Sequence, residues 1–175
     1  MKHFIWSFFI FSLLACNSST TKNFSENGKL AVESKDSYAE IPWVEISEVE
    51  NLVKAKSKKI LVDVYTPWCG PCKMMDRMTF TNQEIIDQIG KNFYAVKFNA
   101  EGQDTVVFQG KTYANPNFKT EIPPNRRNTR HELSPFFAVR GYPSLVIMDE
   151  KMNIIGKIVG FKQPNQLKAE LAKYM

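Results

Sequence analysis

Residues 61–73 read Leu-Val-Asp-Val-Tyr-Thr-Pro-Trp-Cys-Gly-Pro-Cys-Lys. Together with Ile60, the first five residues form an apolar and β-branched run that predicts a strand buried on both faces, interrupted only by the charge of Asp63. A helical pattern begins at about Cys69. A CxxC pair at a helix start places its first sulfur where free backbone N–H groups and the helix dipole stabilise a thiolate. The second sulfur lies one turn inside, as disulfide exchange requires.

The chain of 175 residues contains three cysteines. Cys16 closes an apolar run near the amino terminus, whereas Cys69 and Cys72 form a lone CxxC pair. A structural disulfide or a four-ligand zinc site would need further cysteines. The alternative that the pair is half of a metal site lacks two suitably spaced ligands, so we expect no metal and place the chemistry in this pair.

The sequence of the first 40 residues predicts a targeting segment followed by a flexible tether. A positive start is followed by an apolar run over residues 4–14, which is too short for a permanent membrane span and predicts a signal peptide over residues 1–15. Leu13-Leu14-Ala15-Cys16 resembles the lipobox of bacterial lipoproteins, which implies lipidation of Cys16. An ordinary signal peptide cleaved elsewhere is the alternative. Residues 16–40 are mostly polar and predict a flexible tether, so the folded domain is expected over residues 41–175.

Working outward from the CxxC pair, hydrophobic periodicity predicts an α/β domain. Two capping boxes are expected, Ser47 with Glu50 and Thr81 with Glu84, and Met74, Met75 and Met78 can face the core. Strands are predicted at residues 43–46, 60–65, 93–99, 144–148 and 154–159, and helices at 47–57, from 69, from 81 to 90, at 133–139 and at 165–174. This order favours a central mixed sheet with helices on both faces.

The match at residues 61–73 extends to other positions, and together they resemble the thioredoxin family. Gly141-Tyr142-Pro143 resembles the family's cis-proline loop, Lys97 falls where the family has a lysine near the buried aspartate, and Gly160 follows the last strand. The resemblance covers about residues 41–175 and implies a thioredoxin fold, with an insertion at about residues 101–133 before the cis-proline loop. It points to a thioredoxin-like lipoprotein of Gram-negative bacteria.

The resemblance implies a role for each polar residue of the site. Cys69 is the nucleophile and Cys72 the resolving thiol, and Asp63, with a pKa raised by burial, accepts the proton of Cys72. Lys97 would tune Asp63. Two alternatives remain open: Asp63 can be a structural carboxylate held by hydrogen bonds, and Lys97 a solvated strand residue.

The resemblance also implies a groove for the partner. Gly70 and Pro71 form the active-site loop with Trp68, while Pro143, in the cis form, and Tyr142 bind the partner polypeptide beside the sulfurs. For Trp68, plain packing is an equal alternative.

The predicted insertion contains a small hairpin at residues 106–113 and a second part, residues 115–130, rich in Pro, Asn and Arg. A loop of this length is either functional or disordered. One hypothesis is a partner-selecting flap in which Arg126, Arg127 and Arg130 supply positive charge, and the alternative is a mobile solvated loop. His131 either tunes the sulfurs or makes local contacts at a helix start.

We therefore expect an enzyme of the cell envelope, anchored by the lipid on Cys16 and facing the periplasm, that reduces disulfides of partner proteins. The Gly-Pro spacer resembles that of reducing family members. Electrons would come from a membrane thiol-disulfide donor, with no cofactor beyond the Cys69–Cys72 pair, and the protein would be a monomer. The alternatives are a disulfide oxidase or isomerase, or a polypeptide-binding module. The net charge of +5 is scattered and no recognition motif accompanies it, so we expect no nucleic-acid binding.

Overall fold

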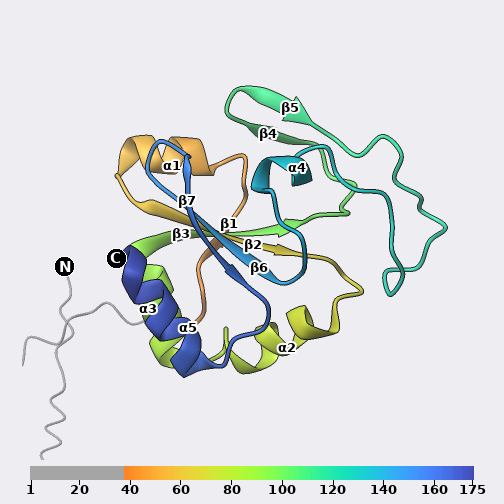
Figure 1. Ribbon diagram of the computed structural model, residues 1–175. Helices are drawn as coiled ribbons and strands as arrows, with labels where there is room; N and C mark the ends of the chain where they lie inside the picture. Colours follow the sequence, from red (N-terminus) through yellow and green to blue (C-terminus); the bar gives the residue numbers. More distant parts are fainter. Residues whose placement is uncertain (1–37) are drawn as a thin grey trace, which may run out of the picture. The chain divides into compact units, whose positions relative to one another are not determined.

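The computed structural model describes residues 38–175 (Figure 1). The predicted signal peptide, Cys16 and nearly all of the predicted tether lie outside the described residues. At the start of this part of the chain, the backbone N–H of Tyr38 donates to Asp87 Oδ1 at 3.1 Å. Within this part of the chain, none of the helices has the length and apolar character needed to cross a membrane.

A five-stranded sheet forms the centre, in the order β1-β3-β2-β6-β7. Its strands are β1 (Trp43–Val44), β2 (Lys59–Tyr65), β3 (Phe93–Asn99), β6 (Ser144–Met148) and β7 (Ile154–Val159). β3 runs parallel to both β1 and β2, whereas β6 is antiparallel to β2 and β7 is antiparallel to β6. The predicted mixed sheet is therefore confirmed.

Helices cover both faces of the sheet (Figure 1). One face carries α2 (Gly70–Met78), α3 (Gln83–Asn92) and α5 (Pro164–Leu171), which continues into a short 3-10 turn, η1 (Ala172–Tyr174). The other carries α1 (Val49–Ala55), α4 (Ser134–Phe137) and the hairpin of β4 (Val106–Phe108) and β5 (Lys111–Tyr113). This arrangement confirms the predicted thioredoxin fold.

The alternation of side chains along β2 separates two cores and aims Asp63. Val62 and Val64 pack with residues of α1 and α4, whereas Leu61 packs with Met75 of α2 and with residues of α3 and α5. Since successive residues of a strand point to opposite faces, Asp63 shares the face of Leu61. The one charge in this strand therefore points to the side on which α2 lies.

Both predicted capping boxes are wrong. A turn in which Glu48 N–H donates to Glu45 O delays the first helix, so α1 begins at Val49 after the N-cap Glu48, without a side-chain cap. In α3 the N-cap is Asn82, whose Oδ1 accepts from the N–H groups of Glu84 and Ile85. Asparagine satisfies this position better than threonine.

The prediction for the methionines of α2 is correct only in part. Met75 is buried, whereas Met74 and Met78 are exposed. The inward side of α2 is defined by Cys72 and Met75, three residues apart, and a helix of this kind buries only one stripe.

The two ends of the insertion are joined by hydrogen bonds to one backbone carbonyl, that of Ala100. Ala100 O accepts hydrogen bonds from His131 N–H at 2.9 Å and from Ser134 Oγ at 2.7 Å. Inside the loop, Asn115 Nδ2 donates to Gly102 O and to Thr129 O, and Asn115 Oδ1 accepts from the Thr129 hydroxyl. The segment after the hairpin is thus tied back to the end of β3 rather than left to solvent.

Candidate functional site

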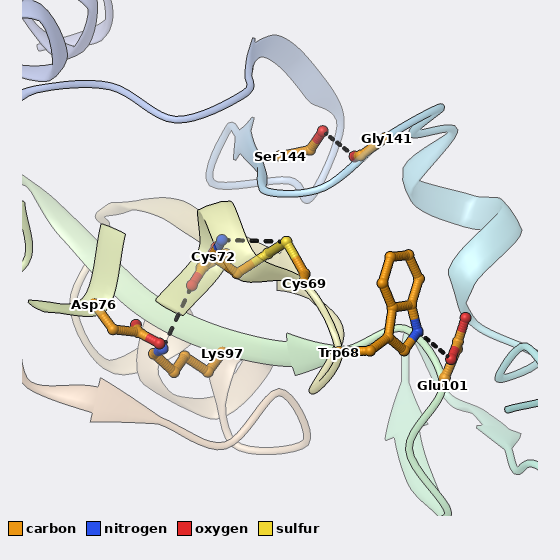
Figure 2. Close-up of a disulfide and its surroundings, with 9 residues drawn as sticks. Trp68, Cys69, Cys72, Asp76, Lys97, Glu101, Gly141 and Ser144 are labelled. Carbon is orange, nitrogen blue, oxygen red and sulfur yellow. Dashed lines mark hydrogen bonds and ion pairs between the residues drawn. A yellow bond between two sulfur atoms is a disulfide. The ribbon is translucent and has the colours of Figure 1, made fainter. Parts of the chain in front are cut away.

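The two cysteines lie at the start of α2 and form a disulfide, with their Cα atoms 5.3 Å apart. Cys69 is the N-cap residue, and its Sγ accepts the backbone N–H of Cys72 at 3.1 Å (Figure 2). Pro71 occupies the first turn, where its missing N–H costs no hydrogen bond. After reduction, this N–H group and the helix dipole would stabilise negative charge on Cys69.

Below the second sulfur lies a row of three charged groups. Asp76 is one helical turn beyond Cys72 and pairs with Lys97 of β3, whose Nζ also lies 3.6 Å from Asp63 Oδ2. Figure 2 shows Lys97 reaching Asp76 beneath α2. Trp43, Tyr65 and Phe80 place their rings around the ammonium group, with centroids 5.1–5.7 Å from Nζ. Lys97 is therefore a bridge between two carboxylates and not a solvated strand residue.

Asp63 is almost fully buried, and its Oδ1 has no hydrogen-bond partner among residues 38–175. Burial raises the pKa of Asp63 from 3.8 to about 6, although the nearby charge of Lys97 opposes this rise. A structural carboxylate would have both oxygens satisfied. The free oxygen and the raised pKa instead suit a group that exchanges a proton near neutral pH.

The first sulfur borders a cavity of about 510 Å³. Trp68 and Tyr142 meet edge to face in its wall, with ring centroids 5.9 Å apart. The Tyr142–Pro143 peptide is cis, as the resemblance implies, and its loop is held by hydrogen bonds from Ser144 Oγ to Gly141 O and from Gly160 N–H to Pro143 O. Gly160 has a φ of +81°, which only glycine adopts freely. The structure thus brings the predicted loop and groove residues to one place.

The insertion reaches the same cavity through Glu101. One carboxylate oxygen, Oε2, accepts from Trp68 Nε1 and from the backbone N–H of Asn128, each at 2.8 Å (Figure 2 shows the first contact). The Arg127 guanidinium lies 4.7 Å from the centre of the Trp68 ring, and Arg130 also lines the cavity. Trp68 therefore packs against the insertion and also lines the cavity beside Cys69.

Two predictions about the insertion need correction or refinement. Arg126 does not line the cavity of Cys69 but a separate one of about 280 Å³, together with Phe118 and Ile122. His131 is buried and does not line the cavity of Cys69. Its Nδ1 accepts a hydrogen bond from Leu133 N–H, so its Nε2 carries the proton and donates to Asp104 O at 2.8 Å.

Sequence reasoning missed three residues of this site. Asp76 could have been found from its position four residues after Cys72, which places both on one side of a helix. Glu101 and Arg140 carry no such signal, since only the folded chain brings them to the cavity. Residues 38–175 contain no group of three or more His, Cys, Asp or Glu side chains arranged to hold a metal.

Comparison with known proteins identifies the family. The model of a thioredoxin-like domain matches residues 46–175, so the chain belongs to the thioredoxin-like family. The fold is shared with a thioredoxin from Thermus thermophilus, with a TM-score of 0.55 at 15% identity over 77% of this chain and 87% of that one.

Two curated relatives illustrate the range of the family. A chloroplastic thioredoxin M-type of Brassica napus is 35% identical over 100 residues, which are 57% of this chain and 54% of that protein. The thiol:disulfide interchange protein DsbD of Actinobacillus pleuropneumoniae serotype 5b (strain L20) is 26% identical over 152 residues, 86% of this chain and 20% of that protein. The chain thus spans about half the length of the first relative and a fifth of the second. As a member of this family, the chain carries a disulfide-bonded cysteine pair at the start of α2.

Proposed function

We propose that this protein reduces disulfides of partner proteins in the cell envelope through the dithiol form of Cys69 and Cys72. The observation that carries the proposal is the unequal placement of the two sulfurs. Cys69 is the N-cap of α2 and borders an open cavity, whereas Cys72 lies inside the helix on the side of the ion-paired Asp76. Of the two cysteines, only Cys69 lines the cavity from which a partner would approach.

The reaction follows from this placement. The Cys69 thiolate attacks one sulfur of the partner's disulfide; a new S–S bond forms, the partner's bond breaks, and its second sulfur leaves as a thiolate that takes a proton from water. Cys72 then gives its proton to the Asp63 carboxylate and attacks Cys69 Sγ. The partner's remaining sulfur leaves as a thiolate, and the partner gains two electrons. The Cys69–Cys72 disulfide, the state seen here, is the product.

Lys97 is a positioning residue in this scheme, because it acts on Asp63 and not on sulfur. Its charge lowers the pKa of Asp63, while burial and the charge of Asp76 raise it. Asp76 also competes with Asp63 for the same ammonium group. The pair of carboxylates around one lysine therefore keeps Asp63 able both to take a proton and to release it.

The reducing direction is supported by the Gly70-Pro71 spacer, which resembles that of reducing family members. To act again, the disulfide must receive two electrons, and we propose a membrane thiol-disulfide donor that is oxidised in return. No dissociable cofactor is needed, since the cysteine pair itself carries the electrons. We propose that the protein acts as a monomer on protein substrates and does not bind nucleic acid.

The location rests on the amino-terminal sequence. The resemblance of Leu13-Leu14-Ala15-Cys16 to a lipobox supports removal of residues 1–15, a lipid on Cys16 and a tether over residues 16–40. A lipid anchor of several acyl chains binds stably to a membrane. We propose that the domain faces the periplasm.

The deciding experiment is the equilibrium reduction potential of the Cys69–Cys72 pair, titrated against glutathione. A value near that of thioredoxin, about −270 mV, supports a reductase, and a value near that of DsbA, about −120 mV, would make the protein an oxidase or isomerase. Cys69→Ser with Cys72→Ser is the control, because a pure binding module would keep its cellular role in that variant. Loss of the cellular role in this double variant would exclude a pure binding module.

A further inference from the structure

Three arginines border the cavity beside Cys69. Arg127 and Arg130 come from the insertion, and Arg140 from the segment between α4 and β6. All three are exposed, and within residues 38–175 none of them takes part in an ion pair. We call these residues, Arg127, Arg130 and Arg140, the arginine rim.

The arginine rim gives the cavity an excess of positive charge, because a single acidic residue lines the cavity with the three arginines. Glu101 also lines the cavity, but its Oε2 accepts from Trp68 Nε1 and from the Asn128 N–H group. Three cations therefore line the cavity with a single anion.

The insertion holds its part of the rim in place. Both polar atoms of the Asn128 side chain, next to Arg127, bind the backbone of Lys119: Oδ1 accepts from its N–H and Nδ2 donates to its carbonyl oxygen. The Arg127 guanidinium in turn lies over the Trp68 ring, directly before the nucleophile. A side chain held in this way loses less conformational entropy when a ligand binds.

We propose that the arginine rim selects partner polypeptides that carry aspartate or glutamate beside the disulfide cysteine. This inference rests on the proposed function and names its substrate class. Guanidinium groups bind carboxylates through two parallel charge-assisted hydrogen bonds, and a cavity with an excess of one charge raises the encounter rate with ligands of the opposite charge.

The arrangement favours a polypeptide over a small acidic disulfide. The arginines belong to two chain segments that meet at this cavity, and Gly141 and Tyr142 of the cis-proline loop form part of the same wall. An extended acidic segment can contact several rim residues at once while its cysteine reaches Cys69.

The test compares three peptides, each closed by one disulfide and identical except for the two residues flanking one cysteine. These are two aspartates, two serines or two lysines. The rate of reduction of each peptide is measured for the reduced full-length protein, for Arg127→Gln with Arg130→Gln, and for Arg126→Gln. Arg126 is the matched control, because it lies next to Arg127 in the chain but lines the other cavity.

We expect the native protein to reduce the aspartate peptide about tenfold faster than the serine peptide, with the lysine peptide slowest. The double variant should lose this preference and keep its rate with the serine peptide, and Arg126→Gln should behave as the native protein does. The preference should also fade in 0.5 M salt.

Several results would overturn the proposal. A native protein that reduces all three peptides at the same rate would show that the rim does not select acidic partners. An equal loss for all three peptides in the double variant would show that the rim acts on the thiolate or on the fold. A loss with oxidised glutathione but not with the aspartate peptide would assign the rim to a small molecule. The proposed reductase function fails separately, if the serine peptide is not reduced at all.

Discussion

Two charged regions lie on either side of the disulfide, and they differ in whether their charges are paired. On the buried side, Asp63, Lys97 and Asp76 alternate in sign and come from β2, β3 and α2, the elements that define the fold. On the open side, the arginine rim carries charges of one sign without ion pairs among residues 38–175 and comes largely from the insertion. Compensated charges suit proton transfer, and uncompensated ones suit recognition. We therefore expect chemistry and partner choice to respond to different substitutions.

The largest effect should come from Cys72→Ser, which removes the resolving thiol from the buried side. Cys69 can still attack, but nothing within the domain can then break the mixed disulfide, so turnover should stop. Non-reducing gels should show a stable covalent complex with a disulfide substrate. Cys69→Ser is the matched control and should form no complex. A complex in Cys69→Ser and none in Cys72→Ser would reverse the assigned roles.

Asp63→Asn should slow turnover at neutral pH by about a hundredfold, because Cys72 loses its proton acceptor. Formation of the mixed disulfide should be nearly unchanged, since Cys69 does not depend on this carboxylate. Rapid-quench measurement of both steps separates the two effects. Glu150→Gln, at an exposed position between β6 and β7, is a control that also removes one negative charge. Equal slowing of both steps would place Asp63 outside proton transfer.

The same carboxylate predicts a pH dependence of stability. The pKa of Asp63 is about 6 in the folded protein and 3.8 in the reference state, so the folded chain keeps a proton that the unfolded chain has lost. The free energy of unfolding should therefore fall as pH rises from about 4 to 6, by about 3 kcal/mol for a shift of about two units. Urea unfolding at several pH values should show this fall in the native protein and not in Asp63→Asn. Parallel curves for the two proteins would contradict it.

On the open side, Asn115→Ala should loosen the insertion. Asn115 is buried and makes three hydrogen bonds within the loop, so we expect a loss of about 2 kcal/mol in the free energy of unfolding. Reduction of an uncharged disulfide should change little. Asn117→Ala, at an exposed position of the same segment, is the control. A large loss of that activity in Asn115→Ala would show that the two sides are coupled.

The smallest effect is expected for Glu101→Gln, which keeps an acceptor oxygen but removes its charge. Charge-assisted hydrogen bonds are about twice as strong as neutral ones, so the contacts to Trp68 and Asn128 should weaken by about 1 kcal/mol. Hydrogen exchange of the Asn128 amide and Trp68 fluorescence should report the change. Glu121→Gln, exposed in the same insertion, should leave both signals as they are.

The buried side was largely predictable from the sequence, and the open side was not. β3, β6 and β7 match their predicted bounds, and β2 begins one residue earlier, because buried apolar runs bounded by turns leave few alternatives. Asp63 stood out as a charge in such a run. The helix caps failed, since Ser47 and Thr81 each lie close to a residue that the local backbone uses instead.

The rim could not be predicted for a different reason. Glu101, Arg127 and Arg140 meet only because the insertion folds back over Trp68, and no period or motif records a contact between such distant positions. The sequence suggested charge in the flap but placed Arg126 with the others. Its neighbour Arg127 lines the cavity beside Cys69, whereas Arg126 lines another cavity.

The double hydrogen bond to the carbonyl of Ala100 has a consequence for evolution and engineering. Because His131 and Ser134 both return to the residue at which the insertion departs, the loop behaves as a cassette whose ends are already joined. Closing a longer or shorter loop between fixed ends changes the free energy only slowly with length. Exchanging residues 101–130 for another sequence should therefore leave the position of the two cysteines unchanged. New client specificities could then arise by replacing this cassette alone.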